Sequence, residues 1–272
     1  MSRRVSIRRS CWWLGLSRSW LKYSSVEKAD GVAGRLMELA RAHPRNGVRM
    51  LWGMLRGEGL KVNVKRVHRL CKKHGLLLKQ KRRRKRRGMG IEVLSRAERP
   101  NQVWAYDFVE DRTESGRKLR ILTVIDEFTR ECVAVETEYR MNAQFVAGTL
   151  LRLFRQRGTP EFVRSDNGPE FIAKHLMRVL ACAGVAARHI EPGSPWQNGV
   201  DERFNGTLRD ECLNMETFHG RDQARAVITL YGRHYNQRRP HSSLGYQTPS
   251  EFAGEWARSN RNQCEDREYA GS

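Results

Sequence analysis

The order of strand and helix patterns after Asn101 restricts the fold more than any other feature of this chain. Short aromatic and β-branched runs predict strands, and longer stretches with an apolar stripe predict helices. We expect three strands, then helix, strand, helix, strand and helix, over residues 103–109, 119–125, 132–137, 142–157, 161–164, 169–183, 185–187 and 198–213. This order predicts an α/β fold, a mixed sheet flanked by helices.

Three acidic residues occupy different positions in this pattern. Asp107 lies on the first strand, Asp166 follows the fourth strand, and Glu202 lies on the last helix. Carboxylates that are brought together cannot all stay charged unless a cation lies between them. Two Mg²⁺ or Mn²⁺ ions, roughly 3.5–4 Å apart, would neutralise them and hold the attacking and leaving oxygens of a phosphodiester. The sequence therefore predicts a metal site for phosphodiester chemistry.

Positive charge is concentrated in the first hundred residues. The whole chain carries 51 Lys and Arg against 30 Asp and Glu, a formal net charge of +21. Residues 1–100 hold 28 basic and 6 acidic residues, a net charge of +22, which leaves −1 for residues 101–272. Counterion release from a nucleic-acid backbone favours such a basic arm. We therefore expect DNA as the partner of this arm.

Length and apolar content restrict the class of protein. The chain has 272 residues, enough for about two domains, and its six cysteines include no Cys-x-x-Cys pair. The apolar stretch around residues 12–16 is too short for a signal peptide, and no run approaches the roughly 18–20 apolar residues of a membrane span. We expect a cytoplasmic, nucleoid-associated protein with free thiols and no membrane contact.

Two helical regions are expected in the basic arm. Residues 1–24 indicate a helix, a turn at Gly15 and a second helix capped by Ser17, the outline of a helix-turn-helix or its remnant. An aromatic seam for self-association is an equal alternative. Residues 25–80 predict a helical DNA-binding domain with helices at 26–42, 47–56 and 64–74. The expected DNA contacts on its last helix are Lys65, Arg66, Arg69, Lys72 and Lys73. A solvated charged face is the alternative for these residues.

Residues 81–100 are expected to form a basic linker that follows phosphates. Its seven consecutive basic side chains repel one another and do not fold alone. The expected DNA contacts are Lys81, Arg82, Arg83, Arg84, Lys85, Arg86 and Arg87. His68, Cys71 and His74 lack a further ligand pair and lie among lysines, so we expect no zinc site there.

Five ordered motifs surround the three acids. They are Trp104-Ala-Tyr-Asp107, Ser165-Asp-Asn-Gly-Pro-Glu-Phe171, Pro192-Gly-Ser-Pro-Trp-Gln-Asn-Gly199, Phe204-Asn-Gly-Thr-Leu-Arg-Asp-Glu211 and Tyr235-Asn-Gln-Arg-Arg-Pro-His-Ser-Ser-Leu-Gly245, and 35 residues separate the second acid from the third. Over about residues 30–255 the chain closely resembles bacterial insertion-element transposases of the IS-three family, specifically the product of the second reading frame, called OrfB.

This resemblance implies a ribonuclease H-like core, like that of retroviral integrases, over residues 101–258, with a flexible tail at 259–272. It implies that Asp107, Asp166 and Glu202 are the catalytic and metal-binding acids. We also expect a homo-oligomer on DNA and fusion to, or assistance from, the product of an upstream reading frame. The chain departs from the family pattern at Val200, where Tyr is usual, and at Arg203, where Ser is usual.

Asp201 is the chief rival for the third acid. Adjacent residues on a helix point about 100° apart, so only one of Asp201 and Glu202 can face the metals. Spacing and the family register favour Glu202. We expect Asp126 and Glu127, at the end of the second strand, to be structural.

Further DNA contacts are expected around the catalytic helix. Trp196 is placed to stack on an unpaired base, with an ordinary core position as the alternative. Asn198 lies beside it, and Arg209 lies on the same helical face as Glu202, where it would bind a phosphate. His241 is expected either to contact DNA or to cap the last helix.

The function expected from these features is transposition. Activated water would cut the phosphodiester at the element's end, and the freed 3′ hydroxyl would attack target DNA. A non-catalytic DNA-binding remnant that represses the element is the alternative from another class, and the intact triad argues against it. A plain metal-dependent nuclease, which cleaves but never joins strands, is the third possibility.

Overall fold

The computed structural model describes residues 6–22, 31–79, 97–166, 168, 170–189 and 199–270. Five strands form one sheet in the order β3-β2-β1-β4-β5. Their bounds are β1 Val103–Arg112, β2 Lys118–Asp126, β3 Cys132–Glu138, β4 Phe162–Ser165 and β5 Ala186–His189. The first three strands pair antiparallel, whereas β4 pairs parallel with β1 and β5 pairs parallel with β4. The expected order of elements and the mixed sheet are confirmed.

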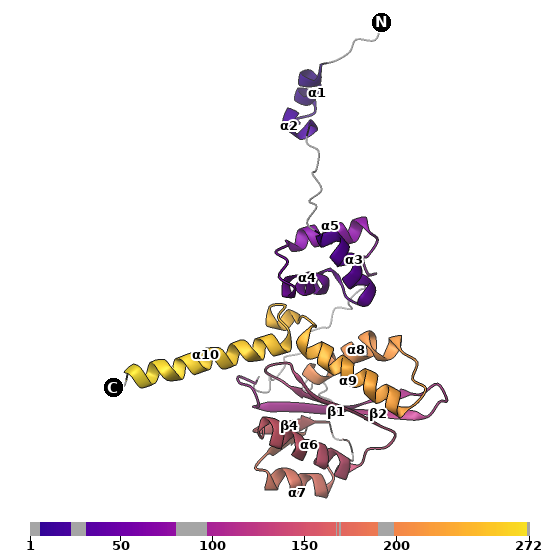
Figure 1. The fold of residues 1–272 in the computed structure, drawn as a ribbon, viewed down its shortest axis with the longest axis vertical. Coiled ribbons are helices and arrows are strands. Elements are labelled where there is room, and N and C mark those ends of the chain that lie inside the picture. Colours follow the sequence, from indigo (N-terminus) through magenta and orange to yellow (C-terminus); the bar gives the residue numbers. More distant parts are fainter. Residues whose placement is uncertain are drawn as a thin grey trace, which may run out of the picture.

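Helices cover both faces of the sheet (Figure 1). The helices of this domain are α6 Ala143–Arg157, α7 Lys174–Cys182, α8 Gly199–Glu211, α9 Arg221–Gln237 and α10 Pro249–Ala270. Strand residues alternate between the faces. Trp104 and Leu122 lie in the apolar cluster beneath α6 and α7, whereas Val109 and Ile121 pack with residues of α8 and α9. Each face of the sheet therefore has its own core.

The structure corrects three expected boundaries. β1 continues to Arg112, because its antiparallel pairing with β2 extends to Lys118. α7 begins at Lys174 and not at residue 169, since residues 170–172 form a turn. α10 continues to Ala270, beyond residue 258 where we expected the catalytic core to end, and no Gly or Pro follows Gly254 in this helix.

The helical domain before the sheet consists of three short helices. They are α3 Val32–Ala42, α4 Val48–Gly57 and α5 Val64–Lys73. Their apolar faces meet in a core of Leu36, Leu51, Leu55, Val67 and Cys71 with their neighbours. The Asn63 side chain accepts a hydrogen bond from the Lys65 amide, so Asn63 is the N-cap of α5. α3 begins at Val32, and residues 23–30, where an earlier start was expected, lie outside the described residues.

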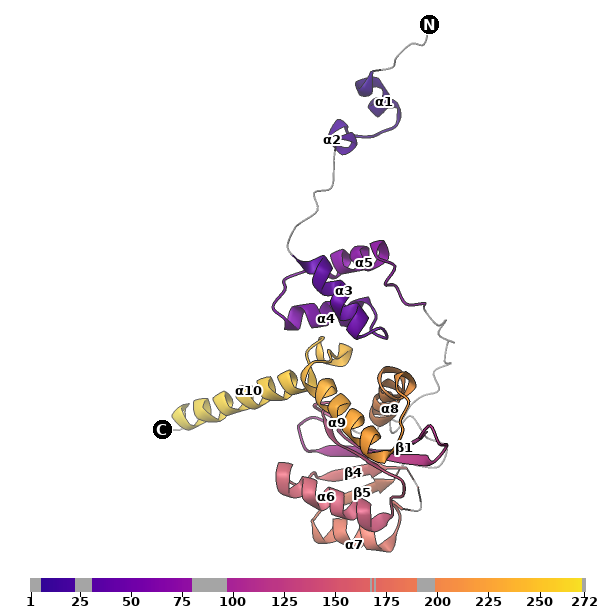
Figure 2. The same cartoon turned by 45° about the vertical axis from the view of Figure 1, so that its right-hand side comes forward.

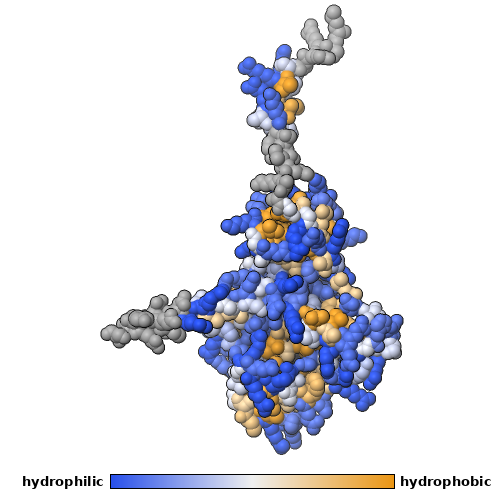
Figure 3. All heavy atoms as spheres, in the orientation of Figure 1, coloured by the Kyte–Doolittle hydropathy of each residue, from blue (hydrophilic) through white to orange (hydrophobic). Residues whose placement is uncertain are grey.

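The first described segment is a pair of short helices, α1 Ile7–Trp13 and α2 Arg18–Leu21, with Ser17 capping the second as expected. Trp12, Leu14 and Trp20 are exposed, and Figure 3 shows hydrophobic residues on the surface of this segment. Among the described residues, no helix combines the length and apolar character of a membrane span.

The helical domain lies against the other domain through α4 and the end of α3 (Figure 2). His43 stacks on His234 of α9 with ring centroids 4.8 Å apart, and the Trp52 ring meets Tyr246 edge-on at 5.4 Å. A Cβ added at Gly53 would lie 2.7 Å from the Cβ of Pro240. Glycine is therefore required where α4 crosses the segment between α9 and α10.

Candidate active site

The strand register places two of the three acids on one face. Asp107 is the register partner of Thr123 on β2, and both face α8. Ala105 pairs with Arg164 in the parallel β1–β4 ladder, so Asp107 and Asp166 each lie two residues beyond that pair. Because side chains two residues apart share a face, both acids belong to the α8 side of the sheet. Asp166 follows the end of β4, as expected.

Asp107 is partly buried, and both of its carboxylate oxygens accept hydrogen bonds. Oδ1 accepts from the Phe108 amide at 2.7 Å, and Oδ2 accepts from Asn205 Nδ2 at 3.0 Å. Burial raises the pKa of Asp107 to about 6, and the negative charges of Asp166 and Glu202 contribute in the same direction. The three acids therefore interact electrostatically through Asp107.

The loop after Asp166 is fixed by aromatic packing. The Gly168 amide donates to Asp166 Oδ1 at 3.0 Å, and a Cβ added at Gly168 would lie 3.0 Å from the same oxygen. Phe171 stacks on Phe108 at 4.7 Å and meets Tyr106 edge-on at 4.8 Å. These rings hold the loop against β1 on either side of Asp107.

Arg120 also binds the loop after Asp166, through an ion pair. Its guanidinium forms an ion pair with Glu170 and lies 3.9 Å from the centre of the Phe108 ring. This pair lowers the pKa of Glu170. The motif residues that follow Asp166 thus stabilise its position.

Asp201 and Glu202 have opposite environments on α8. Asp201 is fully buried, and its Oδ1 lies 3.3 Å from Thr123 Oγ1. Burial and the charge of Asp107 raise the pKa of Asp201 well above its ordinary value. Glu202 is exposed at the surface of the same helical turn. The helix crosses the face of the sheet over β1 and β2, because those two strands carry its apolar partners.

Asn205 links two of these carboxylates. Its amide nitrogen is 3.0 Å from Asp107 Oδ2 and 3.1 Å from Asp201 Oδ2, so its two N–H groups can each donate to a different acid. Its carbonyl oxygen lies 3.1 Å from Thr123 Oγ1. Asn205 is not among the site residues that the sequence predicted. The available signal was its spacing of four residues from Asp201, which places both on one helical face.

The chemistry of this donor set suits a hard dication. Carboxylate oxygens are the ligands that Mg²⁺ and Mn²⁺ prefer, and closely placed negative charges favour a cation between them. Among the described residues, no three side chains of His, Cys, Asp or Glu lie close enough together to form a complete ligand cluster. Asp107 is already oriented by its hydrogen bonds, and the exposed Glu202 would have to turn inward to join it.

The expected DNA contacts are only partly described by the structure. Lys65, Arg69, Lys72 and Lys73 are exposed on α5, and Arg66 is partly buried. Arg209 is exposed on α8. The expected contacts at residues 81–87, 196 and 198 lie outside the described residues.

His241 has a structural position. It is buried, its ring meets Tyr235 edge-on at 4.7 Å, and its backbone pairs with Gln247. The cap of the last helix is formed instead by Thr248, whose hydroxyl accepts from the Glu251 amide while Glu251 accepts from the Thr248 amide. His241 is therefore neither that cap nor an exposed base reader.

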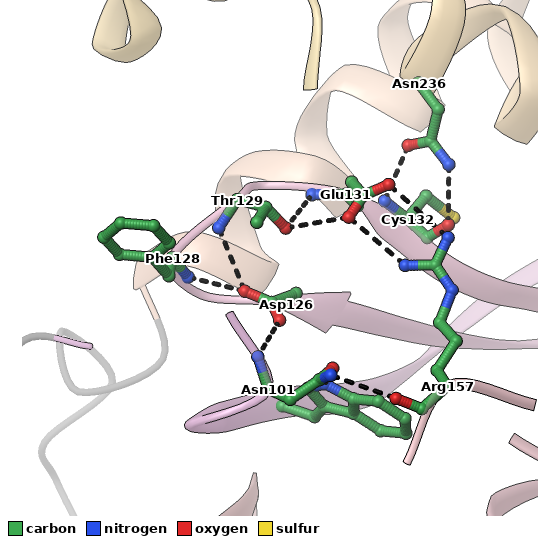
Figure 4. A network of polar contacts seen from close by, with 9 residues as sticks. Asn101, Asp126, Phe128, Thr129, Glu131, Cys132, Arg157 and Asn236 are labelled. Carbon is green, nitrogen blue, oxygen red and sulfur yellow. Dashed lines mark hydrogen bonds and ion pairs between the residues drawn. The ribbon is translucent and has the colours of Figure 1, made fainter. Parts of the chain in front are cut away.

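Asp126 and Glu127 are structural, as expected. Asp126 accepts hydrogen bonds from the backbone amides of Asn101, Phe128 and Thr129, which fixes the turn after β2 (Figure 4). Glu127 forms a buried ion pair with Arg164 at 2.7 Å. Next to this turn, the Asn236 side chain of α9 exchanges two hydrogen bonds with the Cys132 backbone.

Comparison with known proteins places this geometry in a family. Models of the integrase core domain match residues 97–195 and 183–249, and a model of an HTH-like domain matches residues 28–85. The chain is 43% identical to the 31.7 kDa protein of insertion element IS407 from Burkholderia multivorans, over 92% of this chain and 91% of that protein. It is also 30% identical to the putative transposase InsK of insertion sequence element IS150 from Escherichia coli, over 84% of this chain and 85% of that protein. The chain belongs to the insertion-element transposase family.

Other relatives agree with this assignment. The transposase InsD of insertion element IS2 from Escherichia coli is 28% identical, over 91% of this chain and 85% of that protein. In fold, the transposase is similar to a chain of the simian T-cell lymphotropic virus intasome in complex with PP2A regulatory subunit B56 gamma. That match has a TM-score of 0.51 and 15% identity, and covers 80% of this chain and 74% of the other. The transposase therefore has the ribonuclease H-like fold that its motifs predicted.

Proposed function

We propose that this transposase cuts DNA at the ends of its insertion element and joins the freed 3′ hydroxyl to target DNA, using Asp107, Asp166 and Glu202. The observation that supports the proposal is the raised pKa of Asp107, which is caused first by burial and then, in the same direction, by the negative charges of Asp166 and Glu202. Membership of the transposase family supports the reaction class.

The residues of the chain divide the work between binding and orientation. Asp107, Asp166 and Glu202 would hold Mg²⁺ or Mn²⁺, which supplies charge neutralisation and activation of the attacking oxygen when bound. Asn205 holds the Asp107 carboxylate toward α8, and Phe171 fixes the loop that carries Asp166. The buried Asp201 orients Asn205, because it accepts a hydrogen bond from the second N–H of the Asn205 amide.

The test is an assay of cleavage and joining on a labelled duplex that carries the element's end. Asp107→Asn, Asp166→Asn and Glu202→Gln should each abolish both steps while DNA binding persists, because the amides keep the shape but lose the charge. Asp210→Asn is the matched control, since Asp210 is exposed on the same helix. Wild-type protein that binds but never cuts would support the repressor alternative. Cutting without joining would identify a nuclease.

A further inference from the structure

A cavity of about 430 Å³ lies between the helical domain and the catalytic domain. Met50 of α4 lines one side of it. The other side is lined by the first turns of α8, including Gly199 and Arg203, and by the segment after α9, including Arg239 and Ser242. Both domains therefore line the cavity, and part of its wall is α8, the helix that carries Glu202.

Three arginines give this cavity a positive potential. Arg130, Arg203 and Arg239 all line it. Their charges also act on the buried His241 nearby: burial lowers the pKa of His241 to about 3, and the three guanidinium groups contribute in the same direction. An anion in the cavity would be stabilised by the same charges that disfavour protonation of His241.

Arg239 and Arg203 differ in whether they already form an ion pair with an acidic side chain. Arg239 forms two hydrogen bonds with the carboxylate of Glu211, at 2.7 and 2.6 Å. Arg203 is exposed, and within the described part of the chain its side chain forms no ion pair. Arg203 is also the residue that replaces the serine usual at this position of the motif. Its guanidinium is therefore well placed to meet a ligand of opposite charge.

We propose that this interdomain cavity binds backbone phosphates of the DNA strand next to the site of cleavage, with Arg203 and Arg130 as the charged contacts. The inference rests on the proposed function, since it names the part of the DNA that this site would hold. A phosphodiester fits because the cavity adjoins the catalytic helix and offers guanidinium and hydroxyl donors. The docked position of α4 completes the site.

The first experiment measures equilibrium binding of full-length protein to fluorescent duplexes in a chelator, over a range of salt concentrations. One duplex carries the element's end and one is unrelated. The double variant Arg130→Gln/Arg203→Gln should flatten the slope of log K against log salt by about 1.8 on both, about 0.9 for each lost phosphate contact. Arg178→Gln, at an exposed site on α7 of the opposite layer, should leave the slope unchanged. An unchanged slope in the double variant would overturn the proposal.

The single variant Arg203→Ser tests the same site in case the double variant does not fold. Arg203→Ser restores the residue usual in the family at an exposed helical position, so the fold should persist, as checked by thermal unfolding. The expected loss of slope is about 0.9 on either duplex. A folded Arg203→Ser protein with the wild-type slope would remove Arg203 from the site.

The contribution of α4 is tested by Gly53→Ala. A Cβ there would meet the Pro240 ring at 2.7 and 2.8 Å, so the helical domain must shift away from the cavity. The slope should fall, and adding Arg203→Ser should lower it by less than 0.9 further, because the two changes damage one site. Gly34→Ala on α3, where an added Cβ meets nothing within 4 Å, is the control. If Gly53→Ala kept the wild-type slope, the site would belong to the catalytic domain alone.

These measurements separate this proposal from the proposed function. Binding in chelator requires no catalysis, so a wild-type protein that never cuts DNA still has a salt slope to compare. If the wild-type protein is active and the double variant keeps the wild-type slope of log K against log salt, the cavity does not bind phosphates. The proposed reaction is unaffected by that result.

Discussion

Two adjacent acids, Asp201 and Glu202, lie in different surroundings because a helix turns one side chain into the protein and the other toward solvent. Glu202→Gln should abolish cleavage, since it removes an expected metal ligand. Asp201→Asn should lose far less, because its buried carboxylate contacts Asn205 and Thr123 and not solvent. The comparison is made by cleavage rate at saturating DNA. Equal losses at the two positions would show that Asp201 takes part directly.

Asn205 should matter through the orientation of Asp107. Asn205→Leu keeps a similar volume but removes the donor to Asp107 Oδ2, and a hydrogen bond to a charged group contributes about 1.5–3 kcal/mol. We expect the cleavage rate to fall by roughly ten- to a hundredfold with little change in DNA affinity. Asn214→Leu, at an exposed position just beyond α8, is the control. A loss confined to DNA affinity would contradict an orienting role.

The metal requirement also belongs to the scale of single residues. After exhaustive chelation, Mg²⁺ or Mn²⁺ should each restore cleavage and joining, because an all-carboxylate site suits hard ions. Ca²⁺ should support assembly on DNA without chemistry, since its looser coordination does not align the reacting oxygens. Restoration by Zn²⁺ alone would contradict the three-carboxylate mechanism.

At the scale of elements, the end of α3 meets α9 through two histidines, His43 and His234, whose protonation opposes their contact. Burial lowers the pKa of His234 to about 4, and His43, itself shifted downward by burial, contributes along with Arg238 and Arg239 against Glu211. The folded pKa lies below the unfolded value, so the unfolded chain binds more protons between about pH 6.5 and pH 4. The free energy of unfolding should therefore fall as the solution is acidified through this range.

His234→Gln should reduce this acid sensitivity. Between pH 7 and pH 5 the variant should lose less stability than the wild type, by up to about 1 kcal/mol after the partial exposure of the ring is discounted for solvent screening, as measured by urea unfolding. His175→Gln, on the exposed face of α7, is the matched control. A wild-type pH profile in His234→Gln would show that the stacked pair does not govern the response.

The elements were more predictable from the sequence than their contacts. The strands were predictable because apolar alternation and β-branched runs mark them directly, and Asn63 and Ser17 were recognisable as caps from residue type. The position of α8 over β1 and β2 was not predictable, because it depends on which strands become neighbours through the parallel pairing of β1 with β4. Asn205 was missed for a related reason: a single amide has no periodic signal, and its partners come from three separate elements.

At the scale of the whole molecule, the excess positive charge lies in residues 1–100, whereas the predicted catalytic acids lie in residues 101–272. Neutralising residues 81–87 should weaken binding to the element's end and to unrelated DNA alike, since phosphate contacts carry no sequence information. The slope of log K against log salt should flatten by about 0.9 for each lost contact on duplex DNA. A loss of affinity restricted to the element's end, with the slope preserved, would instead make this segment a base reader.

The register between β1 and β4 determines where this protein tolerates a change in length. Residues inserted between β3 and β4 would lengthen a connection and leave Asp107 and Asp166 side by side. One residue inserted within β4 would turn Asp166 to the opposite face of the sheet, against the core under α6 and α7. The number of residues between the two acids can therefore change without separating them. The number of residues within the four-residue strand β4 can change only in steps of two, because a single insertion turns Asp166 to the other face.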